Sequence, residues 1–436
     1  MLRRPRIHAL LGVALALALV TAPAALAQGA DFSRYVSIGD SLTQGFSAGG
    51  VVEDVQDIGY PALINQQANG TNEGFAQPTV SSPGIPPLLQ LRGLAPTVLT
   101  PASGFGAPTN LNFPGLYNNV AISGALLADI IDRRTDNGGL FDLVLRGQGT
   151  MLELAIAQQP TFTTVWAGNN DVLFAATAGI IIEDFTLTSV ANFESRFRTI
   201  IGQLAAAGTD LAIANIPDVL AIPFVTTVPA VLVDPVTNQV VLVNGNPVPL
   251  IGTDGPLRPG QDFVLLRASA SLARGIGVPV EAGGTGQPLD DTDYLSAEEI
   301  AVISARLAAF NQIITTVANE TGAVLVDVNG IFNRIATRGL LIGGIEVNED
   351  FLTGGLFSYD GVHPTPLGYA VVANAFIDAI NRDRGTSISR VRYRPYLFGG
   401  LNGTGVDIES QVNALQGSSV RFTRPADQAL RFALGI

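Results

Sequence analysis

Short runs rich in β-branched residues alternate with segments of helical period along most of this chain. Such alternation is typical of βαβ units, in which helices connect parallel strands, so it predicts an α/β protein with a parallel sheet. Ligands of open α/β sheets bind outside the carboxyl ends of the strands, and the residues after each run are therefore candidates for chemistry. The expected strands are residues 34–38, 116–122, 162–167, 210–215 and 323–328.

Helices are predicted where apolar residues recur at helical spacing after a capping residue. Ser296 and Glu299 form a capping box, and Gly322 supplies a stop. The three helices expected on these grounds are residues 297–320, residues 365–380 starting at Thr365-Pro366, and residues 192–204.

Two regions interrupt the alternation. Residues 70–115 form a loop rich in proline and glycine, too long for a simple connection, and we expect it to be either functional or a small extra element. Residues 224–291 form a second insert. Within it, residues 230–233 and 239–243 predict a hairpin around a turn that contains Pro235.

The N-terminus has the pattern of a secretion signal. Arg3, Arg4 and Arg6 precede an apolar stretch over residues 9–20, and small residues at 25–27 fit a cleavage site. We therefore expect a secreted or periplasmic protein. No later segment is expected to reach the length of a transmembrane helix.

Charge and cysteine content exclude several classes of function. The chain has no cysteine, which rules out disulfides, thiolate metal sites and a cysteine nucleophile. Its formal charge of −13 becomes −16 once the three signal arginines are removed, and such a charge opposes binding to nucleic acid.

The expected organisation is a signal peptide at 1–27, one domain at 28–383 and a basic extension at 384–436.

Ser41 follows the first expected strand, in the string SIGDSLTQG. A serine at a strand-to-helix turn can be an ordinary N-cap. The same position also exposes a hydroxyl beside the positive end of a helix, where a nucleophile is useful. Thr43 occupies the last glycine position of the G-x-S-x-G elbow, which counts against an ordinary α/β-hydrolase.

Three further strings carry polar residues. YNNVAISGA places Gly124 at an expected helix start, where a backbone N–H can approach a ligand, and WAGNND places Asn170 after the third strand as an amide donor. Asp360 and His363 lie in DGVHP, and His363 is the one histidine beyond the signal. The carboxylate can orient the imidazole as a base, although a turn with a capping aspartate explains that string equally well.

The four strings occur in the order of the sequence blocks of the GDSL, or SGNH, hydrolase family, and the chain resembles that family from about residue 31 to 381. The resemblance implies a flavodoxin-like three-layer α/β/α sandwich with five parallel strands. It implies Ser41 as nucleophile and Asp360 with His363 as the acid–base pair. The oxyanion donors implied are Ser41, Gly124 and Asn170.

A family member of this kind would be a secreted serine esterase or lipase that hydrolyses carboxylic esters through an acyl-enzyme. The apolar loop at 70–115 is expected to contribute to an acyl pocket. A carbohydrate O-acetylesterase would use the same residues, and a non-catalytic surface or binding protein on the same scaffold is a further alternative.

No cofactor is expected. Asp290, Asp291 and Asp293 are close enough in sequence for calcium, but a hydrated acidic loop is the favoured interpretation, and no metal site is predicted. The expected partners are a small or lipid-like ester and water. Nucleic acid is not expected as a partner, whereas association with a membrane is possible from the sequence but is not implied by it.

Overall fold

The computed structural model describes residues 29–94, 97–234, 237, 239–397 and 420–422. At its centre lies a parallel sheet with the strand order β1-β6-β7-β14. These strands match four of the five predicted runs, and together with the helices on both faces they confirm the predicted α/β class. Their bounds are Tyr35–Gly39, Phe162–Trp166, Asp210–Ala214 and Val324–Val326.

The second predicted strand, residues 116–122, is wrong as a regular strand. This segment runs beside β1 but forms only one parallel bridge, between Asn119 and Ser37. One side chain replaces a backbone donor: Asn118 Nδ2 donates to the carbonyl of Tyr35, whereas the backbone N–H of Asn118 bonds to Ala76 in a loop. Backbone bonds to β1 remain at Ser37, which donates to Asn118 at 2.9 Å and accepts from Val120 at 3.0 Å. The order of segments across the sheet is nevertheless the flavodoxin-like order.

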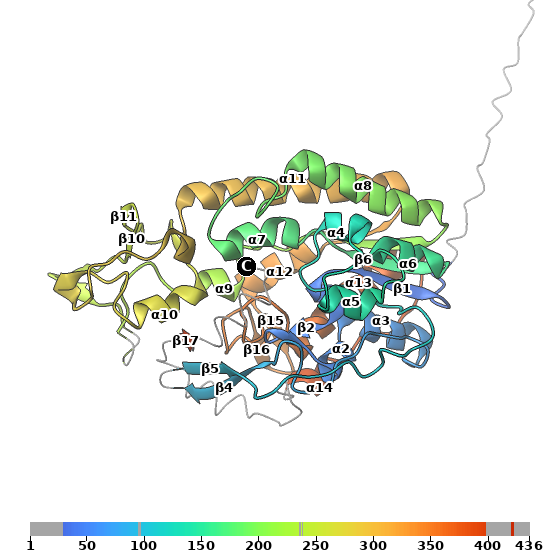
Figure 1. The fold of residues 1–436 in the computed structure, drawn as a ribbon, viewed down its shortest axis with the longest axis horizontal. Coiled ribbons are helices and arrows are strands. Elements are labelled where there is room, and N and C mark those ends of the chain that lie inside the picture. The colour runs from blue at the N-terminus through green and yellow to red at the C-terminus, as the bar shows by residue number, and fades with distance from the viewer. Residues whose placement is uncertain (1–28, 95–96, 235–236, 238, 398–419, 423–436) are drawn as a thin grey trace, which may run out of the picture.

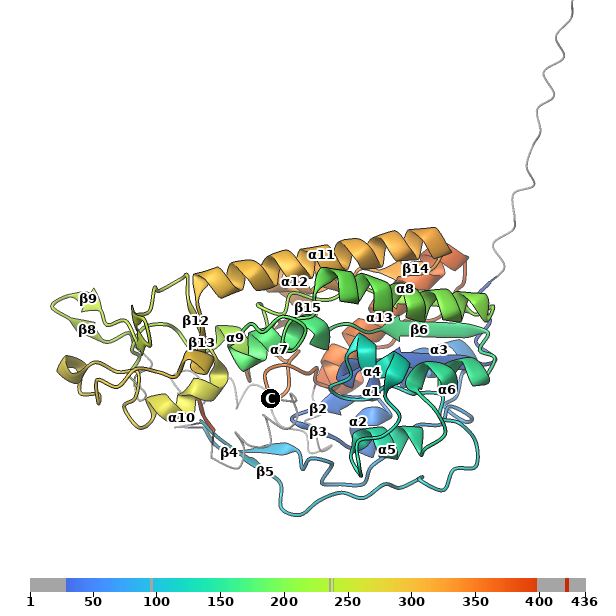
Figure 2. The ribbon, with the colours of Figure 1, turned by 45° about the horizontal axis from the view of Figure 1, so that its top comes forward.

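Helices cover both faces of the sheet (Figures 1 and 2). α4, α6, α7, α8 and α11 pack together on one face, and α3, α12, α13 and α14 lie together on the other. Their bounds are α3 Tyr60–Asn69, α4 Leu127–Asp132, α6 Met151–Ala157, α7 Asn170–Ala178, α8 Val190–Ala206, α11 Ala297–Thr321, α12 Val328–Arg338, α13 Pro366–Arg384 and α14 Arg394–Leu397.

The three predicted helices are all present, as α8, α11 and α13. Ser296 and Glu299 form the expected capping box of α11, and Gly322 ends it in a left-handed conformation. Thr365 caps α13, which continues four residues beyond the predicted end. Between α8 and α11, the rings of Phe193 and Phe310 stack with centroids 3.7 Å apart, so the two helices share one core.

By length and composition alone, α11 could cross a membrane. The expectation that no later segment reaches that length is therefore wrong. The helix packs against α7, α8, β7 and β14 through one apolar face, as a core helix of a globular domain does.

The loop at 70–115 contains a small sheet of its own. Strands β4 (Leu89–Leu94) and β5 (Thr97–Pro101) form an antiparallel pair with a bulge, and β17 (Val420–Phe422) joins β5 in parallel. The loop thus holds the extra small element that its length predicted.

The insert at 224–291 projects from one end of the domain (Figure 1). It has a separate apolar cluster around Leu250, Val264 and Leu289. The predicted hairpin pairs through one bridge between Val233 and Val240, whereas its Pro235 turn lies outside the described residues. The insert and its border contain β8 Leu242–Val243, β9 Asn246–Pro247, β10 Ile251–Gly252, β11 Gly255–Pro256, β12 Phe263–Val264, β13 Tyr294–Leu295, α9 Pro223–Thr226 and α10 Ser269–Leu272.

The remaining short elements lie in loops that follow the core strands and helices. The predicted signal at 1–27 and most of the predicted extension lie outside the described residues. Arg384, at the end of α13, donates to both carboxylate oxygens of Asp210 at 2.7 and 2.8 Å. The remaining elements are α1 Ser41–Gln44, α2 Glu53–Gln56, α5 Leu140–Leu145, β2 Phe46–Ser47, β3 Gly50–Val51, β15 Leu340–Ile342 and β16 Ile345–Val347.

Candidate active site

Ser41 is the first residue of α1, directly after the end of β1. The N-cap of this helix is Asp40, whose carboxylate accepts a hydrogen bond from the N–H of Leu42 at 3.1 Å. The interpretation of Ser41 as the cap is therefore wrong. Gly39 makes the sharp turn feasible, because a Cβ there would overlap the side chain of Thr43. Among the described residues, no hydrogen bond engages the Ser41 hydroxyl, which is thus free for chemistry.

Asp40 is fully buried and is held from a second side by Asn169, whose Nδ2 donates to its carboxylate at 2.7 Å. Burial raises the pKa of Asp40 to about 6, although the hydrogen bonds from Asn169 and Leu42 and the charge of His363 act in the opposite direction. The amide oxygen of Asn169 has no hydrogen-bond partner in the described structure. Asp40 thus ties the start of α1 to the segment before α7.

Asp360 and His363 are in contact: His363 Nδ1 lies 2.9 Å from Asp360 Oδ2, and both side chains are buried. The other oxygen, Oδ1, accepts the backbone N–H groups of Val362 and His363 at 2.9 and 2.8 Å. The turn and the oriented imidazole, which were alternatives in the sequence, are therefore present together. Burial alone would raise the pKa of Asp360, but the charge and hydrogen bonds of His363 outweigh it and hold that pKa below its usual value.

The hairpin formed by β2 and β3, directly after α1, rests on the Asp360 loop. Its two turn residues, Ala48 and Gly49, both have positive φ angles of 48° and 80°. Their N–H groups point at the loop: Gly49 donates to Asp360 Oδ2 at 2.7 Å, and Ala48 donates to Ser358 Oγ at 2.8 Å. Ser358 in turn donates to Asp360. The chain that follows Ser41 therefore helps to fix the carboxylate far downstream.

Ser41 and His363 lie in the same region, but no hydrogen bond joins their side chains in the described structure. Leu42, beside Ser41, lines one pocket together with Val362 and Pro364, the two neighbours of His363. The ring of Phe46 packs against the imidazole with centroids 4.6 Å apart. Contacts between nucleophile and base are often long in enzymes without substrate and shorten in the complex, so this arrangement is compatible with proton transfer.

Gly124 and Asn170 are brought close together, because Asn170 bonds to Ala125, the neighbour of Gly124. Asn170, the first residue of α7, donates from Nδ2 to the carbonyl of Ala125 at 3.0 Å, and no acceptor among the described residues engages its second amide hydrogen. Gly124 has a φ of 77° and lies in a turn before α4, so the prediction that it starts a helix is wrong. The side chain of Gln44 holds this turn by accepting the N–H of Ser123 at 2.8 Å.

A comparison with protein-family models decides the family. The model of the GDSL-like lipase/acylhydrolase family matches residues 35–376. The chain belongs to this family. The match spans all four motifs and confirms the resemblance seen in the sequence. No curated protein sequence matches the chain.

Solved structures of similar proteins include an acetylxylan esterase from Geobacillus stearothermophilus, with 14% identity and a TM-score of 0.38 over 84% of this chain and 100% of that chain. An α/β hydrolase enzyme from the metagenome of Lake Arreo, Spain, has 16% identity and a TM-score of 0.37 over 82% of this chain and 98% of that chain. These sequence identities and TM-scores are too low to indicate which substrate the chain uses.

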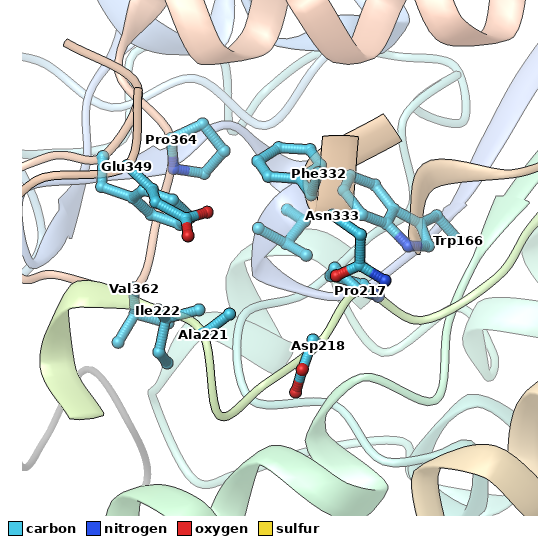
Figure 3. A pocket seen from close by; sticks show the side chains of 12 residues that line it. Trp166, Pro217, Asp218, Ala221, Ile222, Phe332, Asn333, Glu349, Val362 and Pro364 are labelled. Carbon is cyan, nitrogen blue, oxygen red and sulfur yellow. The ribbon is translucent and has the colours of Figure 1, made fainter. Parts of the chain in front are cut away.

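In this GDSL-family chain, a pocket opens next to Leu42, the neighbour of Ser41, and next to Val362 and Pro364, the neighbours of His363 (Figure 3). Most of its wall is apolar, and two carboxylates, Asp218 and Glu349, lie at it. None of the lining residues comes from the loop at 70–115, which we expected to contribute. The pocket is lined by Leu42, Trp166, Pro217, Asp218, Ala221, Ile222, Phe332, Asn333, Glu349, Phe357, Val362 and Pro364.

The acidic run near the end of the insert does not gather into a metal site. Within the described residues, no group of three or more histidine, cysteine, aspartate or glutamate side chains could hold an ion. Asp293 is buried next to Arg267, with 3.6 Å between carboxylate and guanidinium. Its neighbours in the run, Asp290 and Asp291, are both exposed, and Asp290 occupies the N-cap position of the short helix at residues 291–293.

Sequence reasoning missed Asn169, Gln44 and Ser358. All three act on a candidate site residue through a neighbour: Asn169 holds Asp40, Gln44 holds the turn of Gly124, and Ser358 holds Asp360. Their only signal in the sequence is adjacency to the motifs, which does not reveal a hydrogen-bond partner.

Proposed function

We propose that this GDSL-family chain is a serine hydrolase of carboxylic esters. Ser41 attacks the ester carbonyl while His363 takes the hydroxyl proton through the ring nitrogen that faces away from Asp360. The N–H groups of Ser41 and Gly124 and the free amide hydrogen of Asn170 donate to the oxyanion. His363 then gives its proton to the leaving alcohol, and water repeats the cycle on the acyl-enzyme.

One observation carries this proposal: the buried Asp360–His363 pair with its 2.9 Å contact. The carboxylate already accepts backbone and hydroxyl donors, and its remaining lone pair is directed to Nδ1. An imidazole held in this way keeps its other nitrogen available as a base. A purely structural turn would need only the Oδ1 contacts.

The test is labelling by a fluorophosphonate, which bonds covalently to an activated serine. We expect mass spectrometry to find the adduct on the peptide that carries Ser41, and Ser41→Ala to lose both the adduct and the hydrolysis of p-nitrophenyl acetate. Ser195→Ala, an exposed serine on α8, is the matched control and keeps both. Hydrolysis at the unaltered rate by Ser41→Ala would contradict the proposal.

The lipase and acetylesterase alternatives differ in the acyl group. A series of p-nitrophenyl esters from acetate to a long acyl chain separates them, because activity confined to acetate supports a deacetylase and activity on long chains supports a lipase. The non-catalytic alternative is tested by the same assay. It requires that no ester of the series is hydrolysed above the rate of Ser41→Ala.

We also propose export with removal of the first 27 residues, based on the arginine-rich start and the apolar stretch of the sequence. Expression of the full chain in a bacterium with both cell compartments fractionated tests it. The expected mature N-terminus follows Ala27, and an unprocessed chain in the cytoplasm would contradict the proposal.

A further inference from the structure

The pocket beside His363 carries negative charge with no compensating cation. Asp218 and Glu349 are its only charged lining residues. In the described part of the chain, neither forms an ion pair, and the carboxylate of Glu349 accepts no hydrogen bond. Asp218 accepts only the nearby N–H of Leu220, at 3.0 Å. Figure 3 shows Glu349 and Asp218 on different sides of one open space that Phe332 also borders.

Glu349 is half-buried, and burial raises its pKa to about 7, with the charges of Asp218 and Asp350 adding to the effect. A carboxylate in this situation is stabilised by any cation that enters the pocket. The rest of the pocket wall suits an organic cation, since Trp166, Phe332 and Phe357 supply aromatic surface.

The pocket wall also offers more hydrogen-bond acceptors than free hydrogen-bond donors. Trp166 Nε1 already donates to the carbonyl of Asn215 at 3.1 Å, and Asn333 Nδ2 donates to Asn329 at 2.9 Å. A sugar presents as many acceptors as donors and would leave several of its acceptors without a partner here. A ligand with an apolar body and a positive charge can contact the apolar wall and pair with the two carboxylates at the same time.

The position of the pocket assigns it to one part of the ester. Its lining includes Val362 and Pro364, on either side of His363, and neither Gly124 nor Asn170. In the proposed mechanism the imidazole protonates the leaving alcohol, so the alcohol must lie on the imidazole's side. We infer that this pocket binds the alcohol portion of the ester and selects alcohols that carry an organic ammonium group. This inference rests on the proposed esterase function.

Two acetate esters of nearly equal shape test the inference. Acetylcholine carries a quaternary ammonium, and 3,3-dimethylbutyl acetate carries a carbon in its place. At about pH 8.5, where Glu349 is deprotonated, we expect kcat/KM to be about tenfold higher for the charged ester. The ratio of the two values is the readout, because it cancels any general loss of activity in a variant.

Glu349→Gln and Asp218→Asn keep the size of each side chain and remove its charge. We expect each to lower the ratio severalfold, and the double variant to bring it close to one. Glu281→Gln, which removes an exposed charge outside the pocket, is the control and keeps the ratio.

Equal kcat/KM values for the two esters in the unaltered protein, or a ratio that survives both substitutions, would overturn the inference. Faster hydrolysis of an acetylated sugar than of acetylcholine would overturn it as well. If neither ester is hydrolysed, and p-nitrophenyl acetate is not hydrolysed either, the proposed esterase function fails instead.

Discussion

Asp360→Asn tests the centre of the site, because it changes the charge and donor pattern of the buried carboxylate while keeping its shape. Oδ1 accepts three hydrogen bonds, from Ser358, Val362 and His363, and Oδ2 accepts those of Gly49 and His363 Nδ1. An amide has one oxygen. If that oxygen keeps the three partners of Oδ1, the new NH₂ group faces two other donors.

Two consequences follow from this conflict. The N–H of Gly49 is left without an acceptor in a buried site, which costs about 1–3 kcal/mol of stability. The imidazole must turn its unprotonated Nδ1 toward the amide, so its other nitrogen carries the hydrogen and can no longer act as a base. A loss of kcat of about 10⁴-fold is expected for such a tautomer change.

The assay combines kcat for p-nitrophenyl acetate with urea unfolding. Asp360 also makes the free energy of unfolding depend on pH, because its pKa in the folded protein lies below the ordinary value of 3.8. The ionised carboxylate stabilises the fold fully above pH 3.8, and this stabilisation is lost as the pH falls through the lowered pKa. Asp360→Asn should lack this acid-induced loss. A variant with kcat within tenfold of the unaltered protein would refute the assigned role of Asp360.

Three further predictions concern neighbouring groups. Asn170→Ala should lower kcat by about 10²- to 10³-fold with little change in KM, and an unchanged kcat would exclude it as an oxyanion donor. In the processed chain, diethyl pyrocarbonate should abolish activity with one modified imidazole per molecule, that of His363; activity that persists after full modification would exclude an imidazole base. Asp40 binds its proton more tightly in the fold, at a pKa of about 6 against 3.8, so its ionisation lowers the stability by up to about 3 kcal/mol as the pH rises from about 4 to about 6. Asp40→Asn should remove that pH dependence in urea unfolding, because an amide does not titrate, and Asn169 can turn its unpartnered oxygen toward the new amide so that the variant still folds. An unchanged pH dependence would exclude Asp40 as its source.

Local signals were sufficient where the physical cause is local. The capping box of Ser296 and Glu299 and the stop at Gly322 involve only neighbouring residues, and the structure contains them as predicted. Residues 116–122 do not form a regular strand because the side chain of Asn118 competes with its own backbone N–H for the carbonyl of Tyr35 on β1. β-branched and apolar content cannot reveal that competition.

Ser41 illustrates a limit of a different kind. Two adjacent residues, Asp40 and Ser41, are both good caps, and a sequence pattern does not distinguish them. The choice depends on the tight end of β1 at Gly39 and on Asn169, which approaches Asp40 from a distant segment. Once Asp40 takes the cap, the hydroxyl of Ser41 has no structural partner in the described part of the chain.

The pocket could not have been assembled from the sequence, because its walls come from segments with no shared pattern. The rule that ligands bind at the carboxyl ends of parallel strands does place Pro217 and Asp218, which follow β7, at the correct edge. Glu349 follows the small hairpin of β15 and β16, outside the sheet, and no rule of strand order brings it there. Glu349 matters because it lines the same pocket as Asp218. One carboxylate in a pocket wall is ordinary, whereas two with no cation from the described residues between them favour a positively charged ligand. The proposed substrate preference therefore depends on the assembled fold.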